Sequence, residues 1–289
     1  MSVDPLWNHD RIVELLCESG RIAFECRKQL KKSFKADESI VTQADCTIEA
    51  LFTEALEDEA SGVYLIGEET LSEKGEDYLA AALAGDCYVI DPIDGTAPYA
   101  HGLPHWGVSV GLMRGGRLTD GAIFLPDLNR PEITITDGAG VREGLRCGGD
   151  WEWRTLEALS EGVDADAPLA ISQDIARTGR VGIETPLHAI GSAVFALIGV
   201  LKRRYRAYVG LLRLWDVAGC LPLLDRLGIS LYHLEDSVLR DLGTEVTEDH
   251  FELSSTAERR WEVLGWLVAC HSGDEDILRR GVDPRSGAV

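Results

Sequence analysis

Apolar residues recur at helical spacing near the start of the chain. Between residues 9 and 33 the positions with this spacing are Ile12, Leu15, Leu16, Ile22, Ala23, Cys26 and Leu30. They fall on one face of an α-helix, so the pattern predicts a long amphipathic helix, which Gly20 could interrupt. Residues 31–45 are interpreted as a polar connection, and residues 46–60 again show a helical pattern.

Short apolar runs that end at glycine, proline or acidic residues predict β-strands. Two of them, within residues 62–70 and 86–96, share one form, in which four apolar or aromatic residues are followed by acids. A pair of longer runs over residues 106–127 predicts a hairpin with Gly115 and Gly116 at its turn.

The rest of the chain continues to mix the two kinds of element. The predicted elements are a second hairpin over 131–144, strands within 168–174, 205–210 and 229–236, helices within 188–204 and 215–228, and a strand with a closing helix within 261–281. Residues 148–167 are polar and acidic and are interpreted as a linker between two halves. Because helices and strands alternate without a strict β-α-β rhythm, we expect layered α and β structure.

The size and composition are those of a folded protein. With 289 residues, 45% of them hydrophobic, the chain is near the upper limit for one core, so we expect a single domain over 1–289 with halves of about 1–148 and 149–289. The chain has no run of about 18 or more apolar residues, so we expect no transmembrane helix. The N-terminus lacks a signal-peptide pattern. Seven scattered cysteines favour reduced, mostly buried thiols in a cytoplasmic protein.

The net charge of −21 limits the partners. It argues against nucleic acids and anionic membranes, because both would be repelled. An anionic substrate would be repelled as well, unless a local cation reversed the sign of the field at its binding site.

Two predicted strands end in carboxylates. Glu68 and Glu69 follow the first strand, and Asp91 and Asp94 follow the second. If these strands are parallel neighbours in one sheet, the four acids gather at one edge. Since two like charges about 4 Å apart repel by roughly 4 kcal/mol at an effective dielectric constant of about 20, such a cluster is typical of a cation site. Oxygen ligands suit magnesium, manganese or calcium rather than zinc.

The turn between the two aspartates offers a further ligand. Pro92 fixes φ and carries no N–H, and Gly95 closes the turn, so the carbonyl of Ile93 could point at the same ion. The ordinary alternative is a solvated turn whose aspartates accept backbone hydrogen bonds. The segment alone leaves both interpretations open.

Three motifs resemble, in this order, the signature of the inositol monophosphatase family: GEET at 67–70, DPIDGT at 91–96 and WDVAG at 215–219. SIVTQADCTIE at 39–49 is similar to the family's Val-Thr-x-x-Asp segment, and IGSA at 190–193 precedes an apolar helix. The resemblance implies a magnesium-dependent, lithium-sensitive phosphatase. It also implies a layered α-β-α-β-α sandwich, an α/β fold, and a homodimer.

The resemblance also implies a set of metal ligands. Glu68, Asp91 and the carbonyl of Ile93 would hold one ion, and Asp91, Asp94 and Asp216 would share a second. The ordinary alternative for Asp216, which stands at a predicted helix start, is an N-cap. The cofactor would be two or three Mg²⁺ ions, with Mn²⁺ as a substitute.

The same resemblance implies roles in catalysis and substrate binding. Glu69 would reach a further, weaker ion or a ligand water. Asp45 and Thr96, counted with Glu68 as catalytic, would orient and deprotonate the attacking water. The backbone N–H groups of Gly95 and Thr96 would receive phosphate oxygens. The other predicted substrate contacts are Gly191, Ser192, Ala193 and Asp216.

The chain departs from the family pattern at the pocket, which makes it an atypical member. Pro98 stands where members commonly carry Asn, so a donor is lost and the loop is stiffened. The glutamate that binds a hydroxyl in inositol-specific enzymes is missing, since Val209 or Gly210 occupies its place. Arg213 is the charge nearby, and is either a plain surface arginine or a group that favours a second anion, as in bisphosphates.

Four neighbouring side chains are interpreted mainly as packing residues or pocket walls. Trp215 is expected to pack as a wedge that aims Asp216, and His101 and His105 to pack beside the site. His188 precedes the IGSA segment and could line the substrate pocket.

The sequence therefore predicts a phosphatase of a small phosphorylated metabolite. Inositol monophosphate, fructose 1,6-bisphosphate, histidinol phosphate and 3′(2′),5′-bisphosphate nucleotides all remain open as substrates. A catalytically silent relative that binds a phosphorylated ligand, and an acidic protein stabilised by calcium, are the alternative classes. The DPIDG spacing does not match an EF-hand loop, which argues against the latter.

Overall fold

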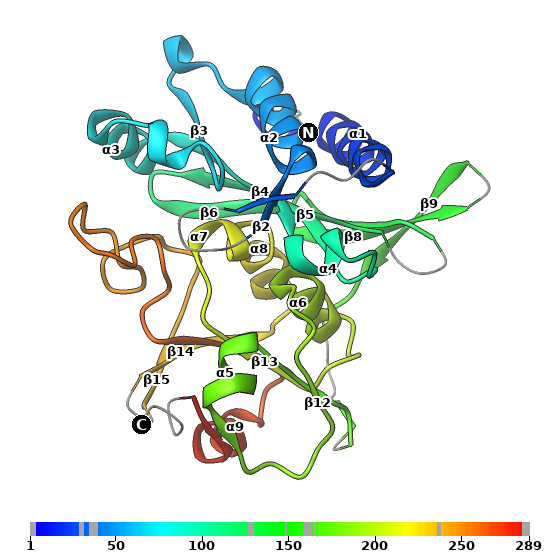
Figure 1. The fold of residues 1–289 in the computed structure, drawn as a ribbon, viewed down its shortest axis with the longest axis vertical. Coiled ribbons are helices and arrows are strands. Elements are labelled where there is room, and N and C mark those ends of the chain that lie inside the picture. Colours follow the sequence, from blue (N-terminus) through cyan, green and yellow to red (C-terminus); the bar gives the residue numbers. More distant parts are fainter. Residues whose placement is uncertain are drawn as a thin grey trace.

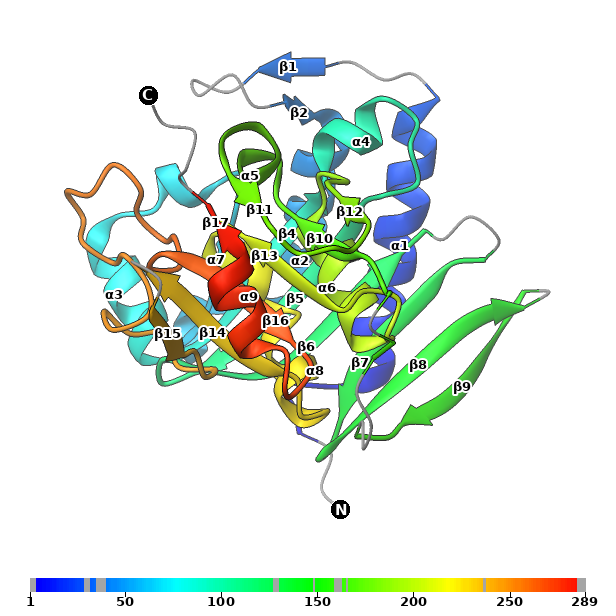
Figure 2. The ribbon, with the colours of Figure 1, turned by 90° about the horizontal axis from the view of Figure 1, so that it is seen from below.

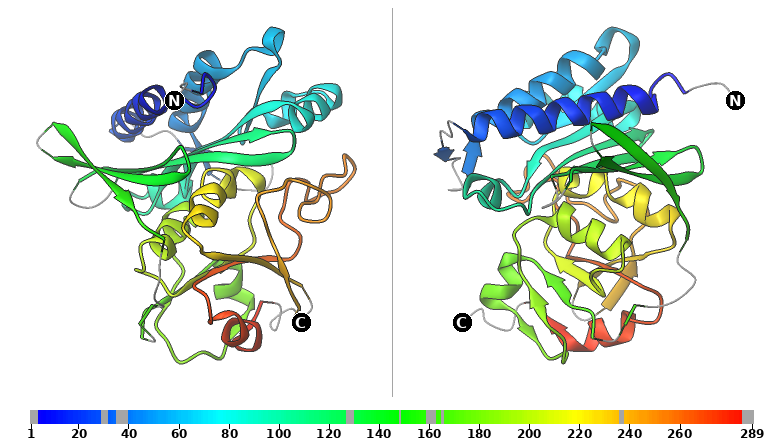
Figure 3. Two further views of the ribbon diagram at one scale, coloured as in Figure 1. Left: turned by 180° about the vertical axis from the view of Figure 1, so that it is seen from behind. Right: turned by 90° about the vertical axis from the view of Figure 1, so that its right-hand side faces the viewer.

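Helices and sheets alternate in five layers (Figure 1). The computed structural model describes residues 4–28, 32–34, 40–126, 130–147, 149–158, 163–164, 166–235 and 238–284. Helices α1 and α2 cover a first sheet, α6, α7 and α8 lie between this sheet and a second one, and α5 and α9 cover the outer face of the second. The predicted layered α-β-α-β-α sandwich is confirmed, and Figure 3 shows α1 and α2 side by side above the first sheet.

The outer helical layer differs in detail from its prediction. Helix α1 (His9–Arg27) ends before residue 33, because β1 (Lys32–Phe34) follows and pairs antiparallel with β2 (Ile40–Thr42). The expected polar connection therefore contains strands, and α2 (Gln43–Leu56) begins within it.

Gly20 does not interrupt α1. It is a buried residue inside the helix, and a Cβ atom at this position would lie 2.5 Å from Cζ of Phe124 in the first sheet. The missing side chain lets the helix approach the sheet closely, so packing against Phe124 explains the glycine.

The first sheet has seven strands in sequence order. They are β3 (Val63–Gly67), β4 (Asp86–Asp94), β5 (Gly107–Arg114), β6 (Arg117–Leu125), β7 (Glu132–Asp137), β8 (Gly140–Cys147) and β9 (Asp150–Leu156). β3 and β4 are parallel, and the other neighbours are antiparallel. Both predicted hairpins, β5–β6 and β7–β8, are confirmed.

The predicted linker over residues 148–167 is wrong for Asp150–Leu156. These residues form β9, which pairs along its length with β8, and Figure 2 shows the two strands side by side at the edge of the sheet. The strand is hard to predict because its alternation is short: only Trp151 and Trp153 are half-buried between exposed polar residues, and the surrounding sequence is polar and acidic. Backbone pairing and the neighbouring rings of Trp151 and Trp153 support it instead.

The second sheet has the order β12-β10-β13-β16-β14-β15. Its strands are β10 (Leu169–Ile171), β12 (Leu187–His188), β13 (Ala207–Gly210), β14 (Ser230–Glu235), β15 (Val238–Asp241) and β16 (Trp266–Cys270). The helices around it are α5 (Gln173–Thr178), α6 (Ala193–Leu201), α7 (Leu214–Ala218), α8 (Leu221–Arg226) and α9 (Glu275–Gly281). The helix predicted within 215–228 is divided into α7 and α8, with Pro222 in the first turn of α8, where proline is tolerated.

Short elements complete the described chain. They are η1 (Glu59–Ser61), η2 (Leu71–Glu73), α3 (Glu76–Ala84), α4 (Thr96–Ala100), β11 (Arg180–Val181) and β17 (Val282–Asp283). Of these, α4 directly follows β4, and β11 pairs antiparallel with β17.

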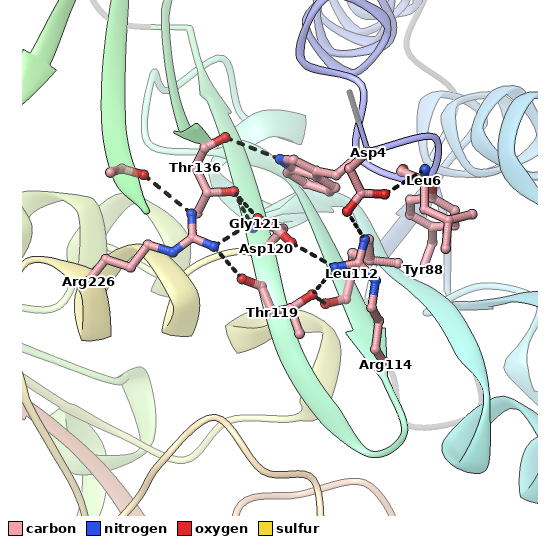
Figure 4. A network of polar contacts seen from close by, with 12 residues as sticks. Asp4, Leu6, Tyr88, Leu112, Arg114, Thr119, Asp120, Gly121, Thr136 and Arg226 are labelled. Atoms are coloured by element: carbon pink, nitrogen blue, oxygen red, sulfur yellow. Dashed lines mark hydrogen bonds and ion pairs between the residues drawn. The ribbon is translucent and has the colours of Figure 1, made fainter. Parts of the chain in front are cut away.

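A polar network ties the middle helical layer to the first sheet (Figure 4). The buried carboxylate of Asp120 in β6 accepts hydrogen bonds from Arg226 of α8 at 2.8 Å and from Thr136 of β7 at 3.0 Å. Arg114 lies between Asp120 and Asp4 and forms an ion pair with each. The network satisfies a carboxylate that would otherwise be buried without a counter-charge.

The cysteines are unpaired, as predicted. Three of the seven are buried, three are half-buried and Cys46 is exposed, so the expectation of mostly buried thiols holds only in part. Among the described residues, no helix combines the length and the apolar character that a membrane span requires.

Candidate active site

Parallel pairing of β3 with β4 brings the two acidic strand ends together. Gly67 is the register partner of Ile90, so Glu68 and Asp91 leave the sheet at the same edge, and Glu68 N donates to the carbonyl of Ile90 at 3.3 Å. The register of β4 against β5 shifts by one residue between Asp91 and Asp94. In a regular strand, residues three apart face opposite sides. The extra residue of the bulge allows both aspartates to face one site.

Asp216 completes a cluster with these two aspartates. One carboxylate oxygen of each of Asp91, Asp94 and Asp216 lies within 4.8 Å of the others. Asp216 belongs to α7, which packs against β4 and β5, and its Oδ2 accepts the N–H of Arg213 at 2.7 Å. The N-cap of α7 is Arg213, and Asp216 is the third residue of the helix, so the N-cap interpretation of Asp216 is wrong, although its side chain does bond the backbone at the helix start. Trp215 beside it is buried, in line with the predicted packing role.

The cluster is electrostatically costly without a cation. Burial and the neighbouring carboxylates, Glu68 first among them, raise the pKa of Asp91 well above its ordinary value. Burial and Asp94 do the same to the pKa of Asp216. Oδ1 of Asp91 is buried and has no hydrogen-bond partner among the described residues. An all-oxygen set with an unsatisfied oxygen fits a hard divalent cation such as Mg²⁺.

Asp94 is held by the start of helix α6. The hydroxyl of Ser192 and the N–H of Val194 donate to its Oδ2, the latter at 2.9 Å, and the N–H of Ala193 donates to its Oδ1 at 3.2 Å. Burial raises the pKa of Asp94 to about 6, against the lowering effect of these hydrogen bonds. Ser192 and Ala193, predicted from the resemblance to touch substrate, thus orient an aspartate of the cluster. Gly191 precedes them with φ of +76°.

Asp45 and Thr96 face each other across the site. Thr96 Oγ1 lies 3.4 Å from Asp45 Oδ1 and 3.0 Å from the carbonyl of Ile93. The other Asp45 oxygen accepts the N–H of Thr42 at 2.8 Å in the capping box of α2. Burial raises the pKa of Asp45 to about 6, which the bonds from Thr42 oppose. A carboxylate and a hydroxyl in this arrangement can pass a proton between them.

Glu49 is a site residue that the sequence analysis missed. It lies one turn after Asp45 on α2, is buried, and accepts the N–H groups of Glu69 and Thr70 at 2.8 Å each. A Cβ atom at Gly67 would lie 2.2 Å from Glu49 Cδ, so only glycine leaves room for this contact. Its spacing of four residues from Asp45 was the available signal, because residues four apart share a helix face.

The turn around Gly95 carries the predicted phosphate contacts. Gly95 has φ of +82°, and its close neighbours are the carbonyl of His105 and Ser192 Cβ. Pro98 stands in the first turn of α4, where an N–H has no acceptor within the helix. The substitution of proline therefore costs α4 no hydrogen bond.

Two of the three histidines named above, His105 and His188, line one cavity. His105 packs edge-on against Phe195, with ring centroids 5.0 Å apart, and His188 Nδ1 lies 3.3 Å from the hydroxyl of Tyr205. Both line a mainly apolar cavity of about 530 Å³. His101 ends α4 as its C-cap. Glu68 and the three clustered aspartates are not among the residues that line this cavity, so His188 does not line a pocket at the cluster.

A sequence model of the inositol monophosphatase family matches residues 10–264. The chain belongs to the inositol monophosphatase family. This membership agrees with the order of the strand-end motifs and with the five-layer fold described above.

Curated family relatives match mostly over part of their length. The inositol-1-monophosphatase of Rhizobium meliloti is 32% identical over 34% of this chain and 35% of its own. Nus factor SuhB of Pseudomonas aeruginosa is 34% identical over 35% of each chain. The chain thus spans about a third of the length of these two relatives. The inositol-1-monophosphatase of Bacillus subtilis is 28% identical over 65% of this chain and 70% of its own.

Solved structures of inositol monophosphatases match almost the whole fold. A staphylococcal enzyme in a LiCl-soaked inhibitory complex gives a TM-score of 0.69 at 13% identity, covering 96% of this chain and 98% of its own. The Thermotoga maritima enzyme gives 0.67 at 18% identity, covering 94% of each. An IMPase/NADP phosphatase complexed with NADP and Ca²⁺ gives 0.66 at 15% identity, covering 96% and 99%. At these identities the likeness establishes the fold.

Proposed function

We propose that the protein is a magnesium-dependent phosphatase that hydrolyses a phosphate monoester of a small metabolite by two-metal activation of water. The observation that carries the proposal is the cluster of the buried Asp91 and Asp94 with the half-buried Asp216, in which an oxygen of Asp91 lacks a partner among the described residues. Family membership supports the reaction class.

The proposed ligand roles are those that the family resemblance implies. Glu68, Asp91 and the carbonyl of Ile93 would hold one Mg²⁺, and Asp91, Asp94 and Asp216 would hold the second. When bound, the ions supply positive charge that stabilises a phosphoryl group and lowers the pKa of water. They also reverse the local sign of the field, which explains how a chain with a net charge of −21 can bind an anion.

The remaining residues would position the water and the phosphate. Asp45 and Thr96 lie together, so the carboxylate can accept a proton that passes through the threonine hydroxyl. The N–H groups of Gly95 and Thr96 would receive phosphate oxygens. Gly191 would contact the substrate beside Ser192 and Ala193, whose observed bonds to Asp94 and whose place at the cluster suit both roles.

Further metal ions, inhibition and oligomeric state are proposed by analogy with the family. A third ion near Glu69, Mn²⁺ as a substitute and inhibition by lithium extend the metal proposal; related enzymes have been solved after a LiCl soak and with Mg²⁺ and phosphate. We also propose a homodimer in the cytoplasm, with the whole chain as one domain. Asp94 and Asp216, one from each half, support the single domain.

Phosphate release from a panel of sugar, inositol, nucleotide and amino-alcohol phosphates tests the proposal. Turnover should require Mg²⁺, fall with added lithium, and drop by about 100-fold or more in Asp94→Asn, since loss of a ligand exceeds the effect of losing a supporting residue. Asp86→Asn, at the other end of β4, is the matched control. Turnover that ignores Mg²⁺ removal would overturn the mechanism. Magnesium binding without turnover of any compound would favour the catalytically silent relative.

A further inference from the structure

A cavity lies beside Glu68, one of the proposed metal ligands. The cavity, of about 530 Å³, has Glu68 and Glu69 on one side and Arg213, Trp215, Arg260 and Trp261 among its other lining residues. Its volume lies in the range of small-molecule sites. We call these four arginine and tryptophan residues the Arg–Trp wall.

Both arginines of the wall lie over a tryptophan. The guanidinium carbon of Arg213 is 5.6 Å from the ring centroid of Trp215, and that of Arg260 is 5.0 Å from the ring centroid of Trp261. Both tryptophans are buried. A guanidinium that stacks on a fixed ring keeps its orientation, and its N–H groups are directed outward in the ring plane.

The two arginines differ in how firmly their present partners hold them. Arg213 lies 3.9 Å from Glu262, beyond hydrogen-bond distance. Arg260 donates to both oxygens of Glu76, but the Glu76 side chain is 62% exposed. The Arg260 side chain is itself 18% exposed, and its Nε donates to the carbonyl of Leu253 at 3.2 Å. These contacts hold its guanidinium at the cavity, where an incoming anion would compete with the exposed carboxylate of Glu76 for a bidentate contact.

The other charges at the cavity are less suited to a ligand. Lys74 donates to Glu57 at 2.8 Å and lies over the ring of Tyr78 at 4.1 Å, so its ammonium is held. Glu76 and Glu258 also line the cavity and would repel a ligand that does not engage the arginines.

The wall is fixed to the segment that carries a predicted metal ligand. Leu214 N donates to the carbonyl of Trp261, and Val263 N donates to the carbonyl of Leu212, both at 2.8 Å. Trp261 has φ of +74°, a conformation that costs a bulky residue of the order of 1–3 kcal/mol. Two residues beyond Leu214 stands Asp216. A strained backbone conformation that hydrogen bonds hold in place is typical of functional sites.

We propose that Arg213 and Arg260 bind a second anionic group of the substrate while its phosphate monoester lies at the carboxylate cluster. The substrate class is then a small molecule with two anionic groups, either a bisphosphate or a phosphorylated carboxylic acid. The inference rests on the proposed phosphatase function.

Matched substrate pairs test the inference. Fructose 1,6-bisphosphate against fructose 1-phosphate tests a second phosphate, and 3-phosphoglycerate against glycerol 3-phosphate tests a carboxylate. In at least one pair the dianionic member should show a kcat/KM about ten-fold or more higher, mainly through KM. This ratio should fall at least five-fold in Arg213→Gln and in Arg260→Gln. Arg21→Gln, an exposed arginine of α1 outside the cavity lining, should keep the ratio.

The outcomes separate this inference from the proposed function. Turnover with a ratio near one in both pairs, or a high ratio that survives both substitutions in well-folded variants, overturns the inference and leaves the phosphatase intact. If no compound is turned over, calorimetric titration of the Mg²⁺-loaded Asp45→Asn protein with the same four compounds decides. The inference is supported if a compound with two anionic groups binds more tightly than its partner and Arg213→Gln abolishes the difference. It is overturned if both members of each pair bind equally well. Melting temperatures identify any variant that does not fold.

Discussion

The hydroxyl of Ser192 donates a hydrogen bond to Oδ2 of Asp94, although the two residues are 98 positions apart. The contact joins the start of α6, in the second half of the chain, to the end of β4 in the first. It makes the orientation of an aspartate in the cluster depend on correct packing between the two sheets.

Ser192→Ala should therefore lower both stability and metal affinity. Ser192 also caps α6 by accepting the N–H of Phe195 at 3.2 Å, and loss of such a cap costs about 1 kcal/mol. Loss of the bond to Asp94 should weaken Mg²⁺ binding by about 10- to 100-fold. Denaturant unfolding and calorimetry measure the two effects.

Asn8→Ala is the matched control for Ser192. Asn8 caps α1 by accepting the N–H of Arg11 at 3.0 Å, far from the cluster. The Asn8→Ala protein should lose a similar amount of unfolding free energy and keep its full Mg²⁺ affinity. Equal affinities in wild type and Ser192→Ala would show that the serine serves only as a cap.

Glu49→Gln should displace the loop that carries Glu68. A glutamine offers one acceptor oxygen, so one of the two N–H groups of Glu69 and Thr70 would face an amide donor. We expect Mg²⁺ affinity to fall about ten-fold, measured by calorimetry. Glu54→Gln, exposed on the same helix, is the control. A lower melting temperature with unchanged affinity would limit Glu49 to a structural role.

Lys202→Met should destabilise the protein in a pH-dependent way. The buried ammonium of Lys202 bridges the buried carboxylates of Glu132 and Glu143. Burial alone would raise the pKa of Glu143, but bonding to Lys202 and Arg154 outweighs it and lowers the pKa. In the wild type this stabilisation is present above the unfolded-state pKa of about 4.5 and is lost as the pH falls through the lower folded-state pKa.

The cost of Lys202→Met should accordingly be largest at high pH. Removal of the buried cation leaves two buried carboxylates with only the more exposed Arg154 and Arg204 as counter-charges. This costs about 3 kcal/mol, and protonation relieves it as the pH falls from 8 to 5. Urea unfolding across this range measures it, with Lys28→Met, in an exposed pair, as control. A penalty that does not shrink on acidification would contradict the assigned charges.

Gly20→Ala should destabilise the protein although alanine is the better helix former. The propensity gain is about 1 kcal/mol, while a methyl group forced against Phe124 costs about 1–3 kcal/mol. Unfolding measurements on Gly20→Ala, Phe124→Leu and the double variant should show coupling, because the smaller side chain makes room. A more stable Gly20→Ala protein would contradict the close packing.

Local patterns in the sequence determined much of the first sheet and the identity of the cluster. The β5–β6 hairpin follows from alternating apolar runs around Gly115 and Gly116, which need only neighbours along the chain. Asp91 and Asp94 stand out because acids follow a buried strand within one short segment. The motif order that includes Asp216 indicated the family before any contact was known.

Tertiary structure decided which polar residues support that cluster. Glu49 offered only its four-residue spacing from Asp45, Ser192 was predicted to contact the substrate rather than Asp94, and Arg260 resembles an ordinary surface arginine. Their contacts join the sheet edge to residues between 20 and 100 positions away. Strand β9 carries only a short signal, the alternation of Trp151 and Trp153 with polar residues, because its pairing with β8 uses backbone groups that every residue carries. Sequence periodicity reports burial along one element, whereas sheet register and the packing of the two halves determine which side chains meet.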